Sequence, residues 1–335
     1  MVERTQLLTT IRFPRYSPMQ GRARRVRYFL YAIAGLEVAA AFLLWRLRAG
    51  ESACAVNVHG IRFAPIICPI ARLVNVRAVV TIHFGVESML RQRRALIRAA
   101  LSMADEVISV SSTTTALVGN LAMACPVVTI PVWADSSRFF PGNRETPRRQ
   151  FGWEEKFVVL FVGRLLEGKG VRIVEELAGT MRRAVNTIFC VVGTGPLAKE
   201  LAEAAQLHPN LRYLGRVSKD ALPDYYRAAD LLIVPSTAEG EGTPIVIAEA
   251  LMCGTPVVAS NRGGIPDMIG TVGRVVNPNV GDFERAITEV QALKKESALG
   301  YSQLRSHCFE FAMEHLSPRN YEAVASTFSL GSPQL

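Results

Sequence analysis

Residues 230–259 read DLLIVPSTAEGEGTPIVIAEALMCGTPVVA and carry the clearest signature of the fold. A short apolar run stands at each end of this stretch, which is typical of a buried strand, and the apolar segment between the two runs predicts a helix. We expect that helix to have Thr243 as its N-cap, Pro244 as its first residue and Gly254 as its stop. A strand, a helix and a second strand in this order form a βαβ unit, which indicates a parallel sheet.

The same alternation of short apolar runs and helical segments continues over most of the chain. It is interrupted between Pro131 and Pro147 by a polar, arginine-bearing stretch that is typical of a linker. We therefore predict two doubly wound parallel-sheet domains of Rossmann-like type, at residues 1–140 and 141–315, with a segment at 316–335 that returns to the first domain. The expected strands are 53–58, 77–82, 106–110 and 126–130 in the first domain, and 157–162, 187–192, 211–214, 230–234, 256–259 and 272–276 in the second.

The composition suits globular domains. The chain has 335 residues, of which 49% are hydrophobic and 20% charged, so it is long enough for two domains with large cores. Its six cysteines lie far apart without paired spacing, which favours neither a zinc site nor a disulfide framework. We therefore expect a protein of a reducing compartment, the cytoplasm, with no bound metal.

Positive charge is concentrated in the first part of the chain. Residues 1–150 contain 20 arginines and no lysine against 8 acidic residues. Such a field favours anionic partners: a membrane surface, a phosphate-bearing acceptor or nucleic acid. Nucleic acid is the weakest of these, because no reader motif accompanies the arginines. We expect peripheral contact with an anionic membrane, on the inner face of the cytoplasmic membrane; the alternative is that scattered arginines only solvate a surface.

One apolar segment, Tyr28–Trp45, could be compared with a membrane span. It is 18 residues long and contains Glu37, whereas a spanning helix needs about 20 apolar residues. An interfacial helix is a second interpretation. We expect an ordinary buried helix.

Loops that follow strands hold the candidate ligand-binding residues, because ligands of doubly wound sheets bind beyond the carboxyl ends of the strands. Gly163-Arg164 follows one strand, and Lys169-Gly170 opens the next helix. Glycine lets the backbone approach a ligand, and the two cations suit a diphosphate. Basic residues at a helix start can also be ordinary surface features.

A second loop contains Gly193-Thr-Gly195. It lacks the third glycine of a dinucleotide-binding fingerprint, because Ala198 stands in that place. We interpret it as a tight turn into a helix that starts at Pro196.

Two carboxylates flank the start of the helix within residues 230–259. Glu241 lies in the preceding loop, and Glu249 lies in the helix, whose other residues are almost all apolar. A charge in such a helix needs a partner. The vicinal hydroxyls of a ribose would serve Glu249, and sugar hydroxyls would serve Glu241. The alternative is a helix-capping acid and a salt-bridged acid.

These motifs occur in a characteristic order and spacing over residues 155–280, and together they resemble the family 4 glycosyltransferases of GT-B fold. The segments that carry the resemblance are Gly163-Arg164, Lys169-Gly170, Val192-Gly-Thr-Gly-Pro196, Tyr213-Leu-Gly215, Tyr226-Arg-Ala-Ala-Asp230, Pro235-Ser236, Glu241 with Glu249, and Gly263-Gly264.

The resemblance implies a retaining, metal-independent enzyme that takes a sugar from a nucleoside diphosphate sugar, a co-substrate held mainly by the second domain, and that uses no other cofactor. Arg164 and Lys169, with the backbone at Gly163, would neutralise the departing diphosphate. The physical chemistry agrees, because fixed cations and helix N-termini stabilise negative charge that develops on a leaving group.

The resemblance also places the rest of the donor. Glu249 would hold the ribose, and Glu241 would contact the donor sugar. Backbone amides around Gly242 and Thr243 would help to seat that sugar.

In the first domain, Asn57-Val-His59-Gly60 and Thr81-Ile-His83-Phe-Gly85 resemble the two histidine-bearing strand ends of the family. We expect His83 to lie beside the reacting centre and to bond the donor sugar or the acceptor. A histidine at a strand end can also be purely structural.

The chain departs from the family pattern in its first domain. Only 58 residues precede His59, so we expect this domain to be shortened by about one or two βα units. The linker stretch Pro131-Val-Trp-Ala-Asp135 also differs from the family's usual Pro-Asn-Gly-Val-Asp. Neither departure touches the donor half.

The expected function is that of a glycosyltransferase of polysaccharide or glycolipid biosynthesis, with a nucleotide-sugar donor and a glycan or lipid-linked acceptor as partners. Two alternatives stay open. One is a donor-binding protein that needs a partner chain to complete its acceptor domain, and the other is a nucleotide-sugar epimerase on the same fold.

Overall fold

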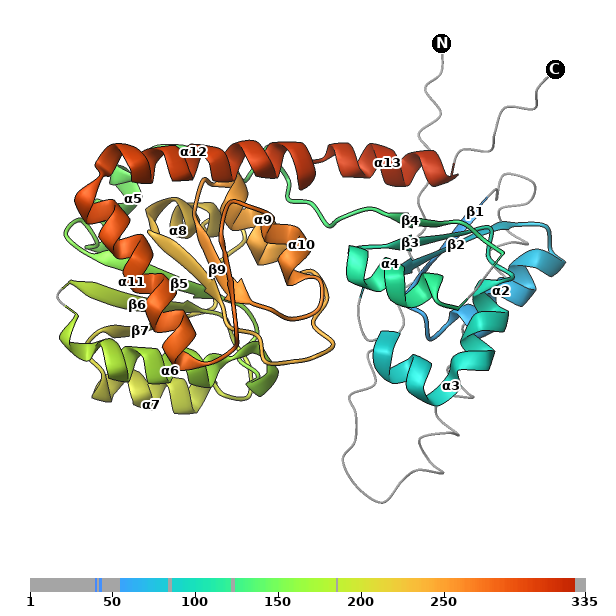
Figure 1. Cartoon of the computed structure of the whole chain (residues 1–335), viewed down its shortest axis with the longest axis horizontal. Helices are drawn as coiled ribbons and strands as arrows, with labels where there is room; N and C mark the ends of the chain where they lie inside the picture. Colours follow the sequence, from blue (N-terminus) through green and yellow to red (C-terminus); the bar gives the residue numbers. More distant parts are fainter. Residues whose placement is uncertain are drawn as a thin grey trace, which may run out of the picture.

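The computed structural model describes residues 40, 42–43, 55–83, 86–121, 124–184 and 186–328. Over these ranges the chain forms two parallel α/β domains that lie side by side (Figure 1). The expected fold class of two parallel-sheet domains is therefore confirmed. The exact limits at residues 140 and 315 stay predictions.

All ten expected strands are present, and their described ends differ from the expected ones by at most two residues. Every neighbouring pair of strands is parallel. In chain order the strands are β1 (Ala55–His59), β2 (Arg77–Ile82), β3 (Glu106–Ser109), β4 (Val127–Thr129), β5 (Phe157–Val162), β6 (Thr187–Val192), β7 (Leu211–Gly215), β8 (Leu231–Val234), β9 (Val257–Ser260) and β10 (Arg274–Val276).

The order of the strands shows where each sheet reverses direction. The second sheet runs β10-β9-β8-β5-β6-β7, so the chain winds outward from β5 in one direction and then from β8 in the other. The point of reversal lies between the neighbours β5 and β8, and this is where doubly wound sheets bind their ligands. The first sheet runs β1-β2-β3-β4 in one direction, so the reversal expected of it is not among its described strands.

The second sheet is covered on both faces because its central strand is apolar throughout. Alternate side chains of a strand point to opposite faces. Val158 and Leu160 of β5 accordingly enter the core on one face, and Val159 and Phe161 enter the core on the other. A run of apolar residues without alternation is what burial on two faces requires.

Helices cover both faces of the second sheet. Those packed on the face with Val159 include α6 (Val171–Thr180), α7 (Ala198–Leu207) and α11 (Val280–Glu296). Those packed on the face with Leu160 are α8 (Leu222–Ala228), α9 (Ile245–Met252), α10 (Ile265–Ile269) and α12 (Ala298–His315). The linker helix α5 (Glu145–Phe151) packs on α8.

The first domain is smaller. Its sheet carries α2 (Ala64–Leu73), α3 (Val86–Leu101) and α4 (Ser112–Gly119). Phe42 is buried in the core of this domain, and the described residues 40, 42 and 43 are helical. They are the described part of the apolar segment Tyr28–Trp45; the rest of that segment lies outside the described residues. Among the residues that are described, no helix is long and apolar enough to cross a membrane.

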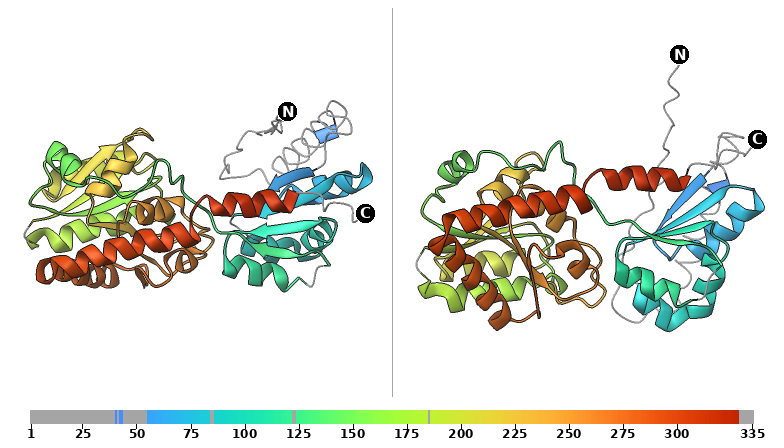
Figure 2. Two further views of the ribbon diagram at one scale, coloured as in Figure 1. Left: turned by 90° about the horizontal axis from the view of Figure 1, so that it is seen from above. Right: turned by 45° about the horizontal axis from the view of Figure 1, so that its top comes forward.

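The last helix of the chain crosses from the second domain to the first. α12 is followed by α13 (Arg319–Phe328), which contacts β2, and Val324 packs on an apolar cluster of Val79, Ile108 and Ile130. Figure 2 shows from two directions how α12 and α13 extend along both domains. The chain therefore passes between the domains twice, once after β4 and once after α12.

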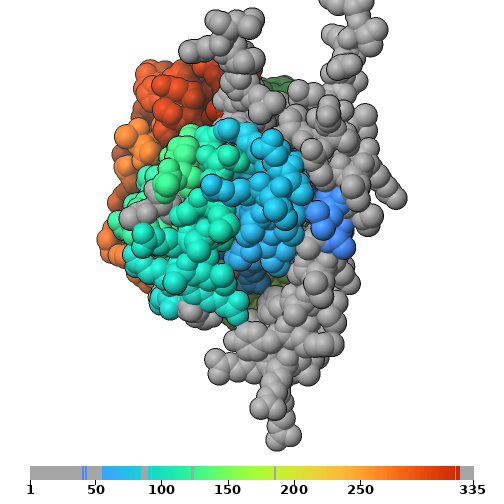
Figure 3. All heavy atoms as spheres, turned by 90° about the vertical axis from the view of Figure 1, so that its right-hand side faces the viewer, coloured from blue at the N-terminus to red at the C-terminus, as the bar shows by residue number. Residues whose placement is uncertain are grey.

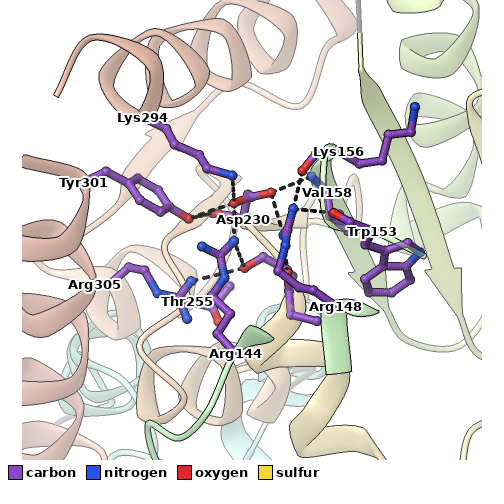
Figure 4. Close-up of polar contacts among 12 residues, drawn as sticks. Arg144, Arg148, Trp153, Lys156, Val158, Asp230, Thr255, Lys294, Tyr301 and Arg305 are labelled. Carbon is purple, nitrogen blue, oxygen red and sulfur yellow. Dashed lines mark hydrogen bonds and ion pairs between the residues drawn. The ribbon is translucent and has the colours of Figure 1, made fainter. Parts of the chain in front are cut away.

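A buried ion cluster in the second domain binds the linker helix and the first turn of α12 (Figure 4). Asp230, directly before β8, is fully buried and pairs with Arg144, with Arg148 at 3.1 Å and with Lys294 of α11 at 2.6 Å. The Tyr301 hydroxyl of α12 donates to the Asp230 carbonyl at 2.7 Å. Burial alone would raise the pKa of Asp230, but the three cations outweigh it and hold that pKa below its ordinary value.

Candidate functional site

The loops after β5 and β8 meet at the point where the second sheet reverses. The loop after β5 contains a short 3-10 turn, Glu167–Lys169, and then Gly170. Gly170 has a φ of +75°, and a Cβ there would lie 1.8 Å from the carbonyl oxygen of Pro235, directly after β8. Only glycine permits this conformation and this approach. The requirement for glycine therefore places Lys169 beside the loop that follows β8.

Lys169 and Glu241 form an ion pair across this junction. The Nζ of Lys169 lies 2.6 and 2.8 Å from the two carboxylate oxygens of Glu241, and the Ser236 hydroxyl lies 2.5 Å from Oε2. The Glu241 side chain is 10% exposed and that of Lys169 34% exposed. A cation and a carboxylate, each held by a charge-assisted hydrogen bond, thus face the carboxyl edge of the sheet.

The loop after β9 supports the segment from Glu241 to Thr243. Gly263 has a φ of +50°, and a Cβ there would lie 1.6 Å from the Glu241 carbonyl oxygen. The Gly264 N–H donates to the Gly242 carbonyl at 3.2 Å. Gly263-Gly264 therefore fixes the backbone of the loop in which the sequence predicted sugar-binding residues.

Helix α9 begins one residue later than the sequence predicts. Its N-cap is Pro244, whose ψ of +116° is extended, and no side chain caps the helix. The expectations of Thr243 as N-cap and Pro244 as first helical residue are wrong, because Pro244 itself keeps an extended ψ and the helical dihedrals begin only at Ile245. Gly254, with a φ of +69°, ends the helix as expected. The first amides of α9 therefore lack a side-chain acceptor.

Glu249 lies on α9, and its partner is a tyrosine. The Tyr226 hydroxyl of α8 donates to Glu249 Oε2 at 2.7 Å. Burial raises the pKa of Glu249 above its ordinary value, and the hydrogen bond from Tyr226 opposes that rise. The prediction that this charge needs a partner is correct, although the partner in the protein itself is Tyr226.

The glycines after β6 serve packing between loops. Gly193 has a φ of +144°, and a Cβ there would lie 1.8 Å from the carbonyl oxygen of Gly163. The loops after β5 and β6 are therefore in backbone contact, which agrees with the interpretation of a tight turn. The following helix, α7, begins at Ala198 and not at Pro196.

Arg164 stands apart from the ion pair. It directly follows Gly163, its side chain is exposed, and it forms no ion pair with any residue that the structure describes. An exposed guanidinium on a strand-following loop is available to an anionic ligand.

In the first domain the two predicted histidines bond to each other. His59 Nδ1 and His83 Nε2 are 2.9 Å apart, and their ring planes differ by 8°. Atoms of stacked rings stay about 3.5 Å apart or more, so these rings meet edge to edge through one N–H···N bond. Two residues before each histidine, on the same two strands, the Thr81 hydroxyl donates to Asn57 Oδ1 at 2.8 Å. Burial lowers the pKa of both histidines, and that of His83 is lowered further by His59.

The two domains touch close to this edge of the second sheet. The carboxylate of Asp267 on α10 accepts hydrogen bonds from the Ser112 N–H at 2.5 Å and from the Ser112 hydroxyl at 2.8 Å. Ser112 is the first residue of α4, so an acid of one domain caps a helix of the other. A Cβ at Gly264 would lie 2.8 Å from the Ser111 Cβ of the first domain.

The structure joins some of the predicted site residues and not others. Lys169 and Glu241 are in direct contact, and Gly242 and Thr243 follow Glu241 in the same loop. No hydrogen bond or ion pair between described residues joins Arg164, Glu249 or His83 to that pair. Tyr226 and Ser236 lie within the motifs, but the spacing of a motif does not reveal which side chains bond, and no motif contains Asp267.

The arrangement suits a ligand that has both anionic and hydroxyl-bearing parts. A lysine, an exposed arginine and an uncapped helix start can bind an anion. Carboxylates such as Glu241 and Glu249 accept hydrogen bonds from hydroxyls. Two parallel-sheet domains that meet at such an edge define the class of GT-B proteins.

Comparison with known proteins shows a family that the second domain resembles. Residues 143–302 match the family described as "Glycosyl transferases group 1". This match lies within the second domain, which is therefore similar to this family, and the resemblance to family 4 glycosyltransferases of GT-B fold is confirmed.

Two relatives illustrate the similarity in sequence. The D-inositol 3-phosphate glycosyltransferase of Geodermatophilus obscurus is 31% identical over 223 residues, which cover 62% of this chain and 48% of the relative. The GDP-mannose-dependent alpha-(1-6)-phosphatidylinositol monomannoside mannosyltransferase of Mycolicibacterium smegmatis is 30% identical over 226 residues, covering 62% and 59%. The chain thus matches about half of the length of these relatives.

Solved structures share the fold. HepE from Anabaena in complex with UDP has a TM-score of 0.70 at 20% identity, covering 81% of this chain and 78% of that one. Sucrose-phosphate synthase from Thermosynechococcus elongatus has a TM-score of 0.73 at 22% identity, covering 90% and 79%. At these identities the likeness supports the GT-B arrangement of both domains.

Proposed function

We propose that this chain transfers a glycosyl group from a nucleoside diphosphate sugar to a glycan or lipid-linked acceptor. The observation that carries the proposal is the Lys169–Glu241 pair at the reversal point of the second sheet, next to the uncapped start of α9. A donor of this kind combines a diphosphate, a sugar and a ribose, which are the groups that these side chains suit.

The diphosphate is assigned to the cations. On this proposal Lys169 and Arg164 bind the phosphate oxygens of the donor. Gly163 has no side chain, so the diphosphate can approach the backbone of its loop. The first amides of α9 point the positive end of the helix toward the same region. These groups stabilise the negative charge that develops on the diphosphate in the transition state, as it leaves the sugar.

The sugar and the ribose are assigned to the acids. Glu241 accepts hydrogen bonds from hydroxyls of the donor sugar, with the amides at Gly242 and Thr243 beside it. Glu249 accepts hydrogen bonds from the ribose. His83 lies on the first domain, where it contacts the sugar or the acceptor from the opposite side.

We further propose that transfer proceeds with retention and without a metal ion. The positions of Arg164 and Lys169 support the metal-independent part, because fixed cations can neutralise a diphosphate in place of a metal. Retention is proposed from the resemblance to family 4 glycosyltransferases. Nuclear magnetic resonance of the fresh product reports its anomeric configuration. Turnover in excess EDTA reports the need for a metal; an inverted product or loss of turnover in EDTA would contradict this part of the proposal.

The acceptor is assigned to polysaccharide or glycolipid biosynthesis. Relatives of the second domain are named for an inositol phosphate and for a phosphatidylinositol mannoside. Both names combine a polyol with a phosphate. An acceptor of this chemistry also fits the arginine-rich first domain.

Peripheral contact with an anionic membrane belongs to the same proposal. α3, on the first domain shown in Figure 3, exposes Arg91, Arg94 and Arg98. A hollow of about 400 Å³ lies between Arg94 and Arg98. Exposed arginines gathered on one element are typical of a surface that docks on acidic lipids.

Vesicle sedimentation tests the membrane contact. We expect the chain to sediment with phosphatidylglycerol vesicles and not with phosphatidylcholine vesicles, and we expect Arg94→Gln with Arg98→Gln to weaken sedimentation several-fold. Equal sedimentation with the two lipids, or by wild type and variant, would contradict it.

A donor panel tests the transfer itself. Thermal shift with UDP-, GDP- and ADP-sugars identifies the donor, since a bound ligand raises apparent stability by mass action. Release of the nucleoside diphosphate is then measured for wild type and for Glu249→Ala. Equal turnover in both would refute the proposal. Isomerised donor as the sole product would indicate an epimerase, and donor binding with turnover only after a partner chain is added would indicate an incomplete enzyme.

A further inference from the structure

Tyr226 has features that its family motif does not explain. It is fully buried at the end of α8, and its hydroxyl donates to Glu249 Oε2 at 2.7 Å. Its ring meets Phe139 edge-on, with centroids 6.0 Å apart. The Thr255 hydroxyl donates to its carbonyl at 2.6 Å. Ring and backbone are therefore both fixed, so the hydroxyl points in one direction.

The fixed hydroxyl restricts the carboxylate of Glu249. The helix neighbours of Glu249, three and four residues away, are Ile245, Val246, Met252 and Cys253, so the helix itself offers the carboxylate no charged partner. Tyr226 occupies Oε2, while Oε1 accepts no hydrogen bond from any residue that the structure describes. A carboxylate held at one oxygen presents the other in a defined direction, which lowers the entropy lost when a ligand binds.

The hydrogen bond also affects the charge. Burial raises the pKa of Glu249, and the bond from Tyr226 opposes this rise. Lys219 and Arg138 act in the same direction as Tyr226. An ionised carboxylate accepts hydrogen bonds more strongly than a neutral one. Loss of the tyrosine hydroxyl would therefore leave a carboxylate that is freer to turn and that takes up a proton at higher pH.

We propose that Tyr226 is the positioning residue for ribose recognition: it holds Oε2 of Glu249 so that Oε1 is free to accept the ribose hydroxyls. The inference rests on the proposed function, because it requires a nucleotide at Glu249. It goes beyond that function by assigning ribose selectivity to a residue that does not itself touch the ligand.

Calorimetric titration with paired nucleotides tests the inference. The probes are UDP, GDP and ADP, each paired with its 2′-deoxy counterpart, and the pair that wild type binds most tightly is used. We expect wild type to prefer the ribonucleotide by about tenfold or more, as hydrogen bonds to a charged group allow. In Tyr226→Phe we expect this preference to fall to about threefold or less, with the affinity for the deoxynucleotide unchanged.

The pH dependence supplies a readout that a purely structural role would not change. The second ionisation of a terminal phosphate, near pH 6, is common to both probes and cancels in the ratio of their affinities. We expect the preference for ribose to decline as the pH falls and Glu249 takes up a proton. In Tyr226→Phe the decline should begin at higher pH.

Tyr225→Phe is the matched control. Tyr225 lies one residue earlier and stacks on Phe151, with centroids 4.5 Å apart, and its hydroxyl has no partner among the described residues. We expect this variant to keep the wild-type preference. If Tyr226→Phe is unstable, Glu249→Gln is measured, and it should lose the preference to a similar extent.

The outcomes separate the two proposals. Wild type that binds none of the three ribonucleotides would overturn the proposed function and the inference with it. Wild type that prefers ribose, with the same preference in Tyr226→Phe, would overturn the inference alone. Equal weakening of both nucleotides by Tyr226→Phe would show a purely structural role and would also overturn it.

Discussion

Gly170 shows how strongly one residue controls the candidate site. Its φ of +75° suits glycine, and a Cβ would lie 1.8 Å from the Pro235 carbonyl oxygen. Gly152 provides a matched comparison, because its φ is +68° but nothing lies within 4 Å of its Cβ position. Alanine substitutions at the two glycines therefore distinguish the cost of backbone strain from the cost of a steric collision.

We predict that Gly170→Ala destabilises the protein more than Gly152→Ala does. The left-handed conformation alone costs about 1–2 kcal/mol for a residue with a Cβ, and Gly170→Ala adds a collision with backbone that must move. Urea unfolding measures both variants. Equal loss of stability would show that the loops after β5 and β8 yield easily, contrary to the packing described.

The Lys169–Glu241 pair leads to a prediction about charge. Lys169→Met should lower the affinity for a nucleoside diphosphate about tenfold or more, since a hydrogen bond between charged groups is lost. The loss should be smaller for the corresponding monophosphate. Lys199→Met, on the exposed face of α7, is the control and should change neither affinity. Calorimetry measures the affinity of each variant for the diphosphate and for the monophosphate. An equal loss of affinity for both nucleotides in Lys169→Met would place Lys169 away from the terminal phosphate.

The histidine pair predicts a pH dependence. Burial lowers the pKa of His59 and of His83, so both rings stay neutral until the pH falls below about 6.5, the ordinary value for histidine. Below that pH the histidines take up protons more readily in the unfolded state than in the folded state, so the free energy of unfolding declines. Resonances of ¹⁵N-labelled histidine, followed with pH, should show two rings that titrate below the ordinary range.

His59→Leu tests the coupling between these rings. It removes the charge that lowers the pKa of His83, so His83 should titrate closer to its ordinary value. His307→Leu, on α12, should leave the His83 titration unchanged. An unchanged His83 titration in both variants would show that the two rings do not interact in solution.

Single residues also show what the sequence could reveal about the site. Lys169 and Glu241 were each predicted to lie at the carboxyl edge of the sheet, because both stand in loops that follow strands; their ion pair was not predicted. The partner roles of Tyr226 and Ser236 could not be predicted in the same way. Their bonds depend on which way a side chain points between packed elements, and spacing does not contain that information.

Secondary-structure elements were predicted well, because the apolar runs of a sheet buried on both faces differ clearly from the amphipathic helices around it. The start of α9 was missed by one residue. Proline fixes φ but not ψ, so a proline at a predicted helix start can serve as first residue or as N-cap. The ion cluster at Asp230 was not predicted, since each of its cations lies more than 60 residues from Asp230 in the sequence.

Asp230 joins four elements, so its removal should destabilise the second domain. Asp230→Ala leaves three cations without their carboxylate, and breaking a buried ion pair costs about 3–5 kcal/mol. Because the pKa of Asp230 is below its ordinary value in the fold, this stabilisation is present above about pH 4 and is lost as the pH falls further. Urea unfolding between pH 3 and 7 measures it.

The control for this prediction is Asp220→Ala, whose side chain is 89% exposed and pairs with Arg138 at 3.5 Å. It should change stability little. A loss for Asp230→Ala that is small, or that grows as the pH falls, would contradict the prediction.

The two domains are joined both by covalent crossings and by contacts at the candidate site. The linker and α12 are held near Asp230, whereas Asp267 and Gly264 meet the first residues of α4. The first group of contacts lies at the amino ends of the strands of the second sheet, and the second group near their carboxyl ends. The domains are therefore anchored at one edge, and their separation at the other edge depends on weaker polar contacts.

The contact at Asp267 leads to a prediction about domain closure. Its carboxylate caps α4 of the other domain through the Ser112 N–H and hydroxyl. A cap of this kind is worth about 1 kcal/mol, so Asp267→Ala should shift the balance toward an open arrangement by about fivefold. Small-angle scattering should give a larger radius of gyration for the variant, and a bound nucleotide sugar should reduce the difference. Asp282→Ala is the matched control, because Asp282 accepts hydrogen bonds at the start of α11 within one domain. An equal radius for wild type and Asp267→Ala would show that other contacts set the closure, and expansion in Asp282→Ala as well would show general loosening of the fold.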